Sequence, residues 1–218
     1  TWHAAEICQN HADMYQKLRR VQVTWRILPD EKMPWGEIAQ RMAEQRSVCT
    51  IVNMKKHAKK LFDALQSECE KESAFYITTE LCPAHRRVVI EQVKKRLRDG
   101  LPCRVIATQC IEAGVDLDFD NVFRALAPLE SIIQAAGRCN RNGRLPEGGQ
   151  VLVFLPDEEN LYPDNWYGRA AMLVSALHDE KPIDLMNPSD IQRYYQRLFR
   201  KLKGSSELDS AIKAQDYA

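Results

Sequence analysis

One segment of the chain combines two arginines and a glutamine at regular spacing. Gln134, Gly137, Arg138 and Arg141 follow one another at intervals of three, one and three residues. On a helix, positions three and four apart share a face, so both guanidinium groups would point at one place. Two such groups repel each other unless an anion lies between them, and guanidinium pairs well with phosphate. The spacing indicates a phosphate site; the alternative is a solvated, salt-bridged helix face.

A second polar segment precedes the first and has the composition of a nucleotide-binding turn. Thr108 follows an apolar run and offers a hydroxyl and a backbone N–H to a phosphate. Gly114 permits a tight turn. Asp116 suits ribose hydroxyls, as acidic residues do in other nucleotide-binding folds, although a turn aspartate can instead bond its own backbone.

These segments lie in a pattern of alternating strands and helices. Short apolar runs predict strands, and apolar residues at helical spacing predict helices between them. We expect Asn53 and Ser131 to cap helices, the second of which runs to about Asn140. Because helices separate the strands, the pattern predicts one α/β domain, a parallel sheet flanked by helices on both faces. The predicted strands are 21–27, 48–52, 74–77, 103–107, 121–126 and 150–155, and the other predicted helices include 34–45 and 83–99.

The chain divides by composition into four parts. A leading segment at 1–14 precedes the α/β domain at 15–157, and a helical extension at 158–203 contains predicted helices at 165–178 and 189–203. A polar tail occupies 204–218. Because the first residue is Thr1 and no signal peptide follows it, we expect the chain to be part of a longer protein.

Composition places this chain among ordinary globular proteins. It has 218 residues, 44% of them hydrophobic, and 31 basic against 30 acidic residues give a net charge of +1. Neither whole-chain disorder nor a membrane span fits, and the net charge points to no partner. Seven cysteines without a C-x-x-C pair indicate a reducing compartment. Two C-x-x-H pairs, Cys8/His11 and Cys82/His85, keep open a zinc-stabilised interaction domain as an alternative.

The two polar segments together resemble a known family. T-x-x-x-E-x-G-x-D after a strand, from Thr108 to Asp116, and Q-x-x-G-R-x-x-R, from Gln134 to Arg141, are similar to motifs V and VI of superfamily 2 helicases. Within that superfamily, 105–120 and 124–143 resemble the helicase-nuclease of type I CRISPR interference, and 48–65 resembles its motif IV. The runs 82–86 and 135–141 look most like the type I-C form.

The resemblance implies a fold and a set of roles. The fold is RecA-like, the second of two motor domains, with ATP between them. Arg141 would be the arginine finger, with Arg138 beside it and Gln134 positioning the γ-phosphate or the attacking water. Gly114, Asp116 and Gly137 would contact the nucleotide. Single-stranded DNA would face Thr108, Gln109, Asn53 and Arg86.

No phosphate loop, magnesium-binding acidic tetrad or histidine-rich nuclease cluster occurs in the sequence. The resemblance therefore assigns Mg²⁺ and most ATP contacts to a first motor domain, leaves no metal site here, and implies that this chain alone is inactive as an ATPase.

The function implied is an ATP-dependent single-stranded-DNA translocase and helicase coupled to a metal-dependent nuclease. It would unwind and degrade target DNA recruited by a crRNA-guided surveillance complex in the bacterial cytoplasm, without membrane contact. Its other partners would be the first motor and nuclease domains and phage anti-CRISPR proteins. The alternatives are another superfamily 2 motor, such as an RNA helicase or a restriction translocase, and a RecA-like module for protein docking.

Overall fold

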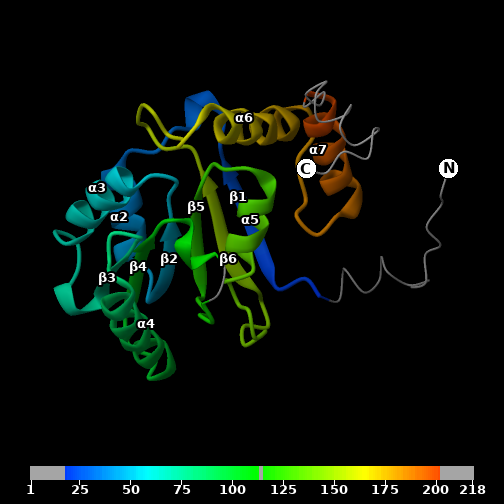
Figure 1. Ribbon diagram of the computed structural model, residues 1–218. Coiled ribbons are helices and arrows are strands. Elements are labelled where there is room, and N and C mark those ends of the chain that lie inside the picture. Colours follow the sequence, from blue (N-terminus) through cyan, green and yellow to red (C-terminus); the bar gives the residue numbers. More distant parts are fainter. Residues whose placement is uncertain (1–17, 113–114, 202–218) are drawn as a thin grey trace, which may run out of the picture.

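The computed structural model describes residues 18–112 and 115–201, with the backbone alone at Lys201 (Figure 1). Strands and helices alternate along most of this range, as the sequence predicts. The strands are β1 (Val21–Arg26), β2 (Ser47–Ile51), β3 (Ala74–Ile77), β4 (Cys103–Ala107), β5 (Asn121–Ala125) and β6 (Gly149–Phe154). The α-helices are α2 (Trp35–Ala43), α3 (Lys55–Leu65), α4 (Pro83–Arg98), α5 (Leu129–Ala136), α6 (Asn165–Glu180) and α7 (Pro188–Lys201), and three short 3₁₀ helices are Pro29–Glu31, Lys71–Ser73 and Gln109–Ile111.

The six strands form one parallel sheet in the order β1-β6-β5-β2-β4-β3. Val21 at the start of β1 lies opposite Gly149 at the start of β6, and Val48 in β2 lies opposite both Arg104 and Asn121. All six strands therefore end at one edge, the carboxyl edge, and begin at the other, the amino edge. The predicted parallel sheet is confirmed.

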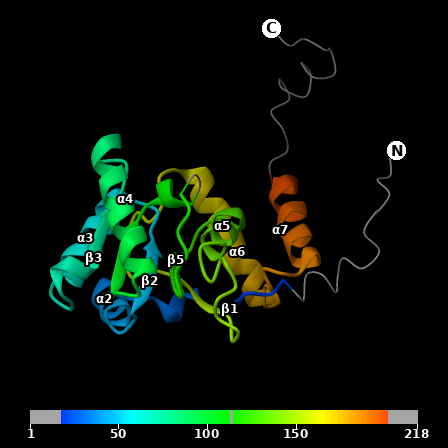
Figure 2. The same ribbon diagram turned by 90° about the horizontal axis from the view of Figure 1, so that it is seen from below.

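Helices cover both faces of the sheet, and each face has its own apolar layer (Figure 2). On one face, α2 and α3 pack Ile38, Met42 and Leu61 against sheet residues such as Ile106 and Phe123. On the other face, α4 and α5 pack residues that include Val93, Leu129 and Ile132. The central strand β2 is buried throughout, which fits its small and apolar side chains; Ser47 and Thr50 are its buried polar residues.

Helices α6 and α7 join the apolar layer that α4 and α5 form. Leu173 and Val174 of α6 and Tyr194 of α7 are buried in it, and the Tyr194 hydroxyl lies 3.3 Å from Oε2 of Glu130 in α5. Figure 1 shows α7 next to one end of α6. The boundary at residue 157 remains a prediction.

Two predicted helix starts are wrong, and so is one helix end. Helix α5 begins after Pro128 and not at Ser131, whose N–H donates to the Pro128 carbonyl. It ends at Ala136, because the following backbone turns away: Phe119 donates to the carbonyl of Arg138 and accepts from the N–H of Asn140. Met54, not Asn53, precedes the first turn of α3, because the Asn53 side chain faces the sheet interior.

In the described ranges, none of the helices has the length and apolar character required to cross a membrane.

Candidate functional site

Arg141 lies in a loop at the amino edge of the sheet, here called the arginine loop (residues 138–145). Its Nε is 3.2 Å from Oδ1 of Asp116, and the two side chains are 43% and 79% exposed. No described residue pairs with the terminal nitrogens of Arg141. The structure thus brings Arg141 and Asp116 together and leaves guanidinium donors open to a further anion.

The Arg138 side chain does not point to the predicted phosphate site. Its side chain is buried, and its two terminal nitrogens donate to the carbonyls of Val115 at 2.5 Å and Glu112 at 2.6 Å. Burial, and after it the charge of Arg141, lower the pKa of Arg138. The prediction that both guanidinium groups point at one place from a shared helix face is wrong, because neither arginine lies on α5. Arg138 holds the backbone beside Asp116 instead.

Two of the remaining nucleotide candidates lie at the end of α5, just before this loop. Gln134, on the last turn of α5, and Gly137, just after it, are exposed. Gly114 falls outside the described residues. These positions leave Gln134 and Arg141 as the exposed polar side chains of the second motif.

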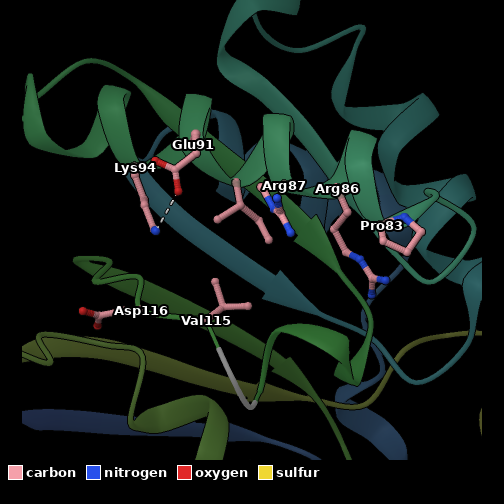
Figure 3. A pocket seen from close by; sticks show the side chains of 8 residues that line it. Pro83, Arg86, Arg87, Glu91, Lys94, Val115 and Asp116 are labelled. Carbon is pink, nitrogen blue, oxygen red and sulfur yellow. Dashed lines mark hydrogen bonds and ion pairs between the residues drawn. The ribbon is translucent and has the colours of Figure 1, made fainter.

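A hollow of about 270 Å³ separates Asp116 from helix α4 (Figure 3). Val115 and Asp116 form one side, and Arg86, Arg87 and Lys94 are among the residues on the other. Arg86, expected to face DNA, lies near the start of α4, which follows the carboxyl end of β3, and so at the far end of the hollow from Asp116 (Figure 3). The hollow carries three cationic side chains against the carboxylates of Asp116 and Glu91, so its net charge favours an anion.

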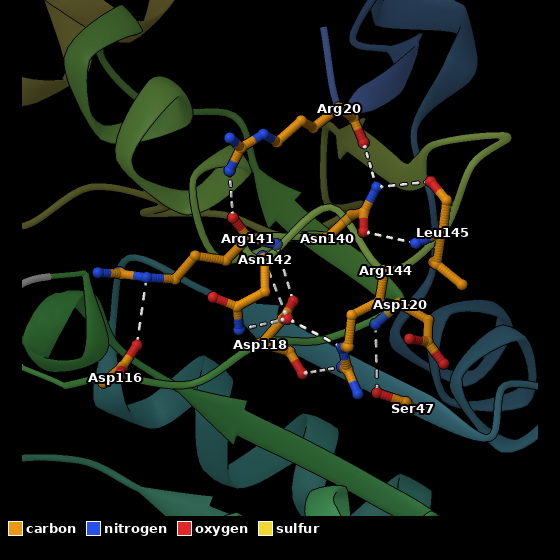
Figure 4. A network of polar contacts seen from close by, with 10 residues as sticks. All are labelled: Arg20, Ser47, Asp116, Asp118, Asp120, Asn140, Arg141, Asn142, Arg144 and Leu145. Atoms are coloured by element: carbon orange, nitrogen blue, oxygen red, sulfur yellow. Dashed lines mark hydrogen bonds and ion pairs between the residues drawn. The ribbon is translucent and has the colours of Figure 1, made fainter. Parts of the chain in front are cut away.

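The arginine loop is anchored on a buried carboxylate, that of Asp118 (Figure 4). Asp118 Oδ1 accepts from the backbone N–H of Arg141 at 2.8 Å, and Oδ2 accepts from Nδ2 of Asn142 at 2.9 Å. Asn140 closes the other side of the loop with hydrogen bonds to the backbone of Arg20 and Leu145. Sequence reasoning missed Asp118, although its place two residues after Asp116 is a usable signal.

The other expected DNA contacts lie at the carboxyl edge, where β2 and β4 end. Gln109 donates to the carbonyl of Asn53 at 3.2 Å, so the structure brings these two residues together. Thr108 is buried, and its N–H, expected to be open to phosphate, donates to the Ile77 carbonyl. Asn53 is also buried, with its amide nitrogen on the Leu126 carbonyl and its oxygen accepting from Arg124.

Arg124 is the centre of a buried network that sequence reasoning also missed. Its side chain is fully buried, with Nη1 2.8 Å from Oδ1 of Asn53 and Nη2 2.9 Å from the Tyr167 hydroxyl. Nη2 also lies 3.0 Å from Oε1 of Glu112. A lone arginine inside the apolar run of β5 signals such a network, because a buried charge needs a partner. Nothing in the sequence indicates Tyr167, which comes from α6.

The open polar groups of this arrangement are suited to binding an anion. Among the described residues, no three His, Cys, Asp or Glu side chains lie close enough to hold a metal ion. Cys82 and His85 are exposed, and Cys8 and His11 lie outside the described residues. The donors that remain open at the amino edge are guanidinium and amide groups, which bind phosphate by hydrogen bonds and charge.

Sequence comparison matches the segment that contains these residues to one family. The family model for the C-terminal region of the CRISPR-associated nuclease/helicase Cas3 matches residues 44–144. A Cas3 of Haloferax volcanii is 52% identical over 84 residues, which are 36% of this chain and 9% of the relative. A Cas3 of Methanothermobacter thermautotrophicus is 33% identical over 151 residues, 68% of this chain and 16% of the relative. The chain thus spans a small part of the length of these relatives.

Solved structures agree with the fold. A structure of T. fusca Cas3 described as a complex with AMPPNP has a TM-score of 0.63 over 90% of this chain and 25% of that one, at 17% identity. The likeness supports a RecA-like motor fold. With the sequence matches across both polar segments, it leads to one conclusion: the chain belongs to the Cas3 family of CRISPR-associated nuclease/helicases, in the part that forms the C-terminal motor domain.

Proposed function

We propose that this chain acts as the second motor domain of an ATP-dependent single-stranded-DNA translocase, and that Arg141 reaches the nucleotide bound by a first motor domain. The observation that carries the proposal is the position of Arg141. It lies on an anchored surface loop with its terminal nitrogens open, inside the segment that matches the Cas3 family. Retained Gln134, Asp116 and Arg141 argue against a module used only for docking.

The residues at the amino edge fit a triphosphate held from the opposite side. Arg141 would exchange Asp116 for the terminal phosphate and neutralise charge that develops there, while the exposed amide of Gln134 orients the phosphate or the attacking water. Asp116 would then be free for the ribose. Arg138 would hold the backbone beside it, and Gly114 and Gly137 would contact the nucleotide. ATP supplies the phosphoanhydride whose hydrolysis releases the free energy for movement.

DNA would pass along the carboxyl edge. Gln109, which is partly exposed, is the best placed of the expected contacts, and Arg86 adds a charge from α4. Thr108 and Asn53 are buried and already hydrogen-bonded, so we assign them to holding this edge in shape. Alternating grip on phosphates by two motor domains would move the strand.

The wider activity follows from the family and is part of the same proposal. The full-length protein would couple the motor to a metal-dependent nuclease and act on DNA opened by a crRNA-guided surveillance complex in the bacterial cytoplasm. One structural relative is a CRISPR RNA-guided surveillance complex described as pre-nicking, with a TM-score of 0.57 at 16% identity. Mg²⁺ would be held by the first motor domain. The type I-C assignment and phage anti-CRISPR proteins as partners remain part of this proposal.

Replacing Arg141 tests the proposal directly. In the full-length enzyme, we expect Arg141→Ala to lower the ATPase rate by about 10³-fold, as for other arginine fingers, and to leave single-stranded-DNA affinity within about twofold. Arg41→Ala is the matched control, because Arg41 pairs with Glu37 on the far face of the sheet. A near-normal ATPase rate in Arg141→Ala would rule out the assignment.

The division of the site between two domains has its own test. The 218-residue chain alone should hydrolyse no ATP, with or without single-stranded DNA. Turnover that persists through successive purification steps would contradict the proposed dependence on a first motor domain.

A further inference from the structure

Asp118 holds more of the arginine loop than any other described side chain. It is 9% exposed. Its Oδ1 accepts from the N–H of Arg141 at 2.8 Å, and its Oδ2 accepts from the N–H of Asn142 at 3.3 Å and from Nδ2 of Asn142 at 2.9 Å. Nε of Arg144 adds a charged contact to Oδ2 at 3.2 Å. One carboxylate thus binds the two successive peptide groups on either side of the Arg141 Cα.

The loop needs such an anchor because no helix supports it. Helix α5 ends at Ala136, two residues before the loop begins. Asn140 and Gly143 both have positive φ, at 44° and 65°, so the backbone reverses around Arg141. In a turn of this kind, the direction of a side chain is set by what binds its backbone N–H and C=O. Arg141 has two such contacts, Asp118 at its N–H and Arg20 at its carbonyl.

The side chains of Asp116 and Asp118 have opposite roles in this geometry (Figure 4). Asp116 is exposed and contacts the guanidinium of Arg141, so a stronger anion can displace it. Asp118 is buried and contacts the backbone, so it stays in place when the guanidinium changes partner. The loop is therefore fixed at its base while the tip of Arg141 remains free to move.

We propose that Asp118 is the positioning residue for Arg141, and that its carboxylate presets the direction in which the guanidinium leaves the loop. The inference rests on the proposed function, in which Arg141 acts on a nucleotide phosphate. Asp118 itself touches neither nucleotide nor DNA. Its loss therefore lowers the rate of the chemical step and leaves both ligands bound as before.

Asp118→Asn is the sharpest substitution, because it keeps the size of the side chain. Both carboxylate oxygens of Asp118 accept hydrogen bonds, whereas an amide has one acceptor oxygen and one NH₂ donor. One of the two oxygen positions therefore becomes a donor in the variant. A donor at Oδ2 faces the donors of Asn142 and Arg144, and the arginine loop must shift. Asp120→Asn is the matched control: it removes a carboxylate two residues away at the same edge, and no described hydrogen bond or ion pair involves that carboxylate.

The first measurement is steady-state ATPase in the full-length enzyme. We expect Asp118→Asn to lower kcat by about 10- to 100-fold, the effect of a misplaced catalytic group, with KM for ATP and the Kd for single-stranded DNA within about twofold. Asp120→Asn should match the wild type. An unchanged kcat in Asp118→Asn, or an equal loss in Asp120→Asn, overturns the proposal.

A double-mutant cycle separates positioning from a general structural role. In the Arg141→Ala background, Asp118→Asn should cost no further activity, because its only route to the reaction is already removed. A structural defect would instead lower the residual rate again. The exchange variant Asp118→Asn/Asn142→Asp restores a carboxylate facing an amide, so we expect it to recover at least a third of the lost kcat. Additive losses in the cycle would contradict the proposal.

Amide hydrogen exchange tests the anchor without any ATPase. In the 218-residue chain, Asp118→Asn should speed exchange of the Arg141 N–H by roughly tenfold and leave the β5 amides unchanged. If Arg141→Ala keeps its ATPase while this exchange effect is seen, the proposed function fails and the anchor stands. If exchange at Arg141 does not change, the positioning role fails, whatever the ATPase shows.

Discussion

Nη2 of Arg124 lies 3.0 Å from Oε1 of Glu112, and both side chains are buried, at 0% and 6% exposed. The pair connects β5 to the segment after β4. The backbone of Glu112 in turn accepts a hydrogen bond from Arg138. A path of direct contacts therefore runs from the Asn53–Arg124 contact at the carboxyl edge to the arginine loop at the amino edge.

Removing Arg124 from this ion pair should lower the stability of the chain. Arg124→Met leaves the carboxylate of Glu112 buried without its partner, and removal of one member of a buried ion pair costs about 3–5 kcal/mol. Burial already raises the pKa of Glu112, and Arg124 is the main influence that opposes this rise. We expect the free energy of unfolding of the 218-residue chain, measured in urea, to fall by that amount.

Two further variants check the cause of that loss. Arg124→Met/Glu112→Met removes both charges and should recover a clear part of the stability. Arg197→Ala breaks the exposed pair with Glu180 and should change stability little. Equal losses in Arg124→Met and in the double variant would show that the ion pair is not the cause.

The Tyr167 hydroxyl should contribute more to the free energy of unfolding than the hydroxyl of the nearby Tyr162. It accepts from Arg124, contacts Oδ1 of Asn53 at 3.2 Å, and lies in a buried network. Tyr167→Phe should lower the free energy of unfolding by about 1–3 kcal/mol, because two buried groups lose a partner. The Tyr162 hydroxyl is buried and has no hydrogen-bond partner among the described residues, so Tyr162→Phe should be neutral or stabilising. Urea unfolding of both variants makes the comparison, and the reverse order would refute it.

Stability should fall in mild acid because of two histidines. Burial lowers the pKa of His57 and of His178 below the usual 6.5, and Nδ1 of His178 accepts from the N–H of Ile183. The unfolded chain therefore binds these protons first, so stability is full above about pH 6.5 and declines as the pH falls below it.

Thermal unfolding between pH 7.5 and pH 5.5 tests this dependence. His178→Asn, which keeps an acceptor near Ile183, should reduce the slope. His85→Gln removes an exposed histidine and should leave the slope as it is. A flat profile in the wild-type chain would contradict the expectation.

A methyl group at position 149 should strain the packing beneath the arginine loop. A Cβ on Gly149 would lie 2.4 Å from Sγ of Cys139 and 2.9 Å from Cβ of Asn140. We expect Gly149→Ala to cost about 1–3 kcal/mol, as overpacking does, and Cys139→Ala to offset part of it in the double variant. A Cβ on Gly36 would meet nothing within 4 Å, so Gly36→Ala in α2 should be neutral or stabilising. Urea unfolding distinguishes the two glycines.

The alternation of apolar runs was sufficient to predict the sheet. Strands such as 103–107 are correct to the residue, because a strand buried on both faces has little choice of sequence. The end of α5 was not predictable in this way. Gly137 follows as the C-cap and is a local stop signal, and Phe119 then pairs with the backbone around Cys139. A contact between distant segments overrides the helical spacing of Arg138 and Arg141.

The site was predicted in part, and the missing residues share a physical cause. Asp116 and Arg141 lie together with exposed side chains, and the roles that the resemblance implies for them stay predictions. Asn53 and Arg138 are of residue types that often contact ligands, but their side chains form hydrogen bonds inside the protein instead. Whether a polar side chain points to solvent or to the interior depends on the partner available there, and such partners, for example Tyr167, come from elsewhere in the chain.

The pairing of β1 with β6 has a consequence for the order of assembly. β1 is an edge strand, and its neighbour in the sheet is the last strand of the sheet to be synthesised. Strands β5, β2, β4 and β3 can pair with one another during synthesis on the ribosome. The backbone of β1 stays unpaired until β6 is made. A chain that stops before Gly149 therefore leaves β1 without a neighbour and β5 with an open edge, and both are templates for aggregation. Chaperone capture of nascent chains should thus end when β6 emerges and closes the sheet.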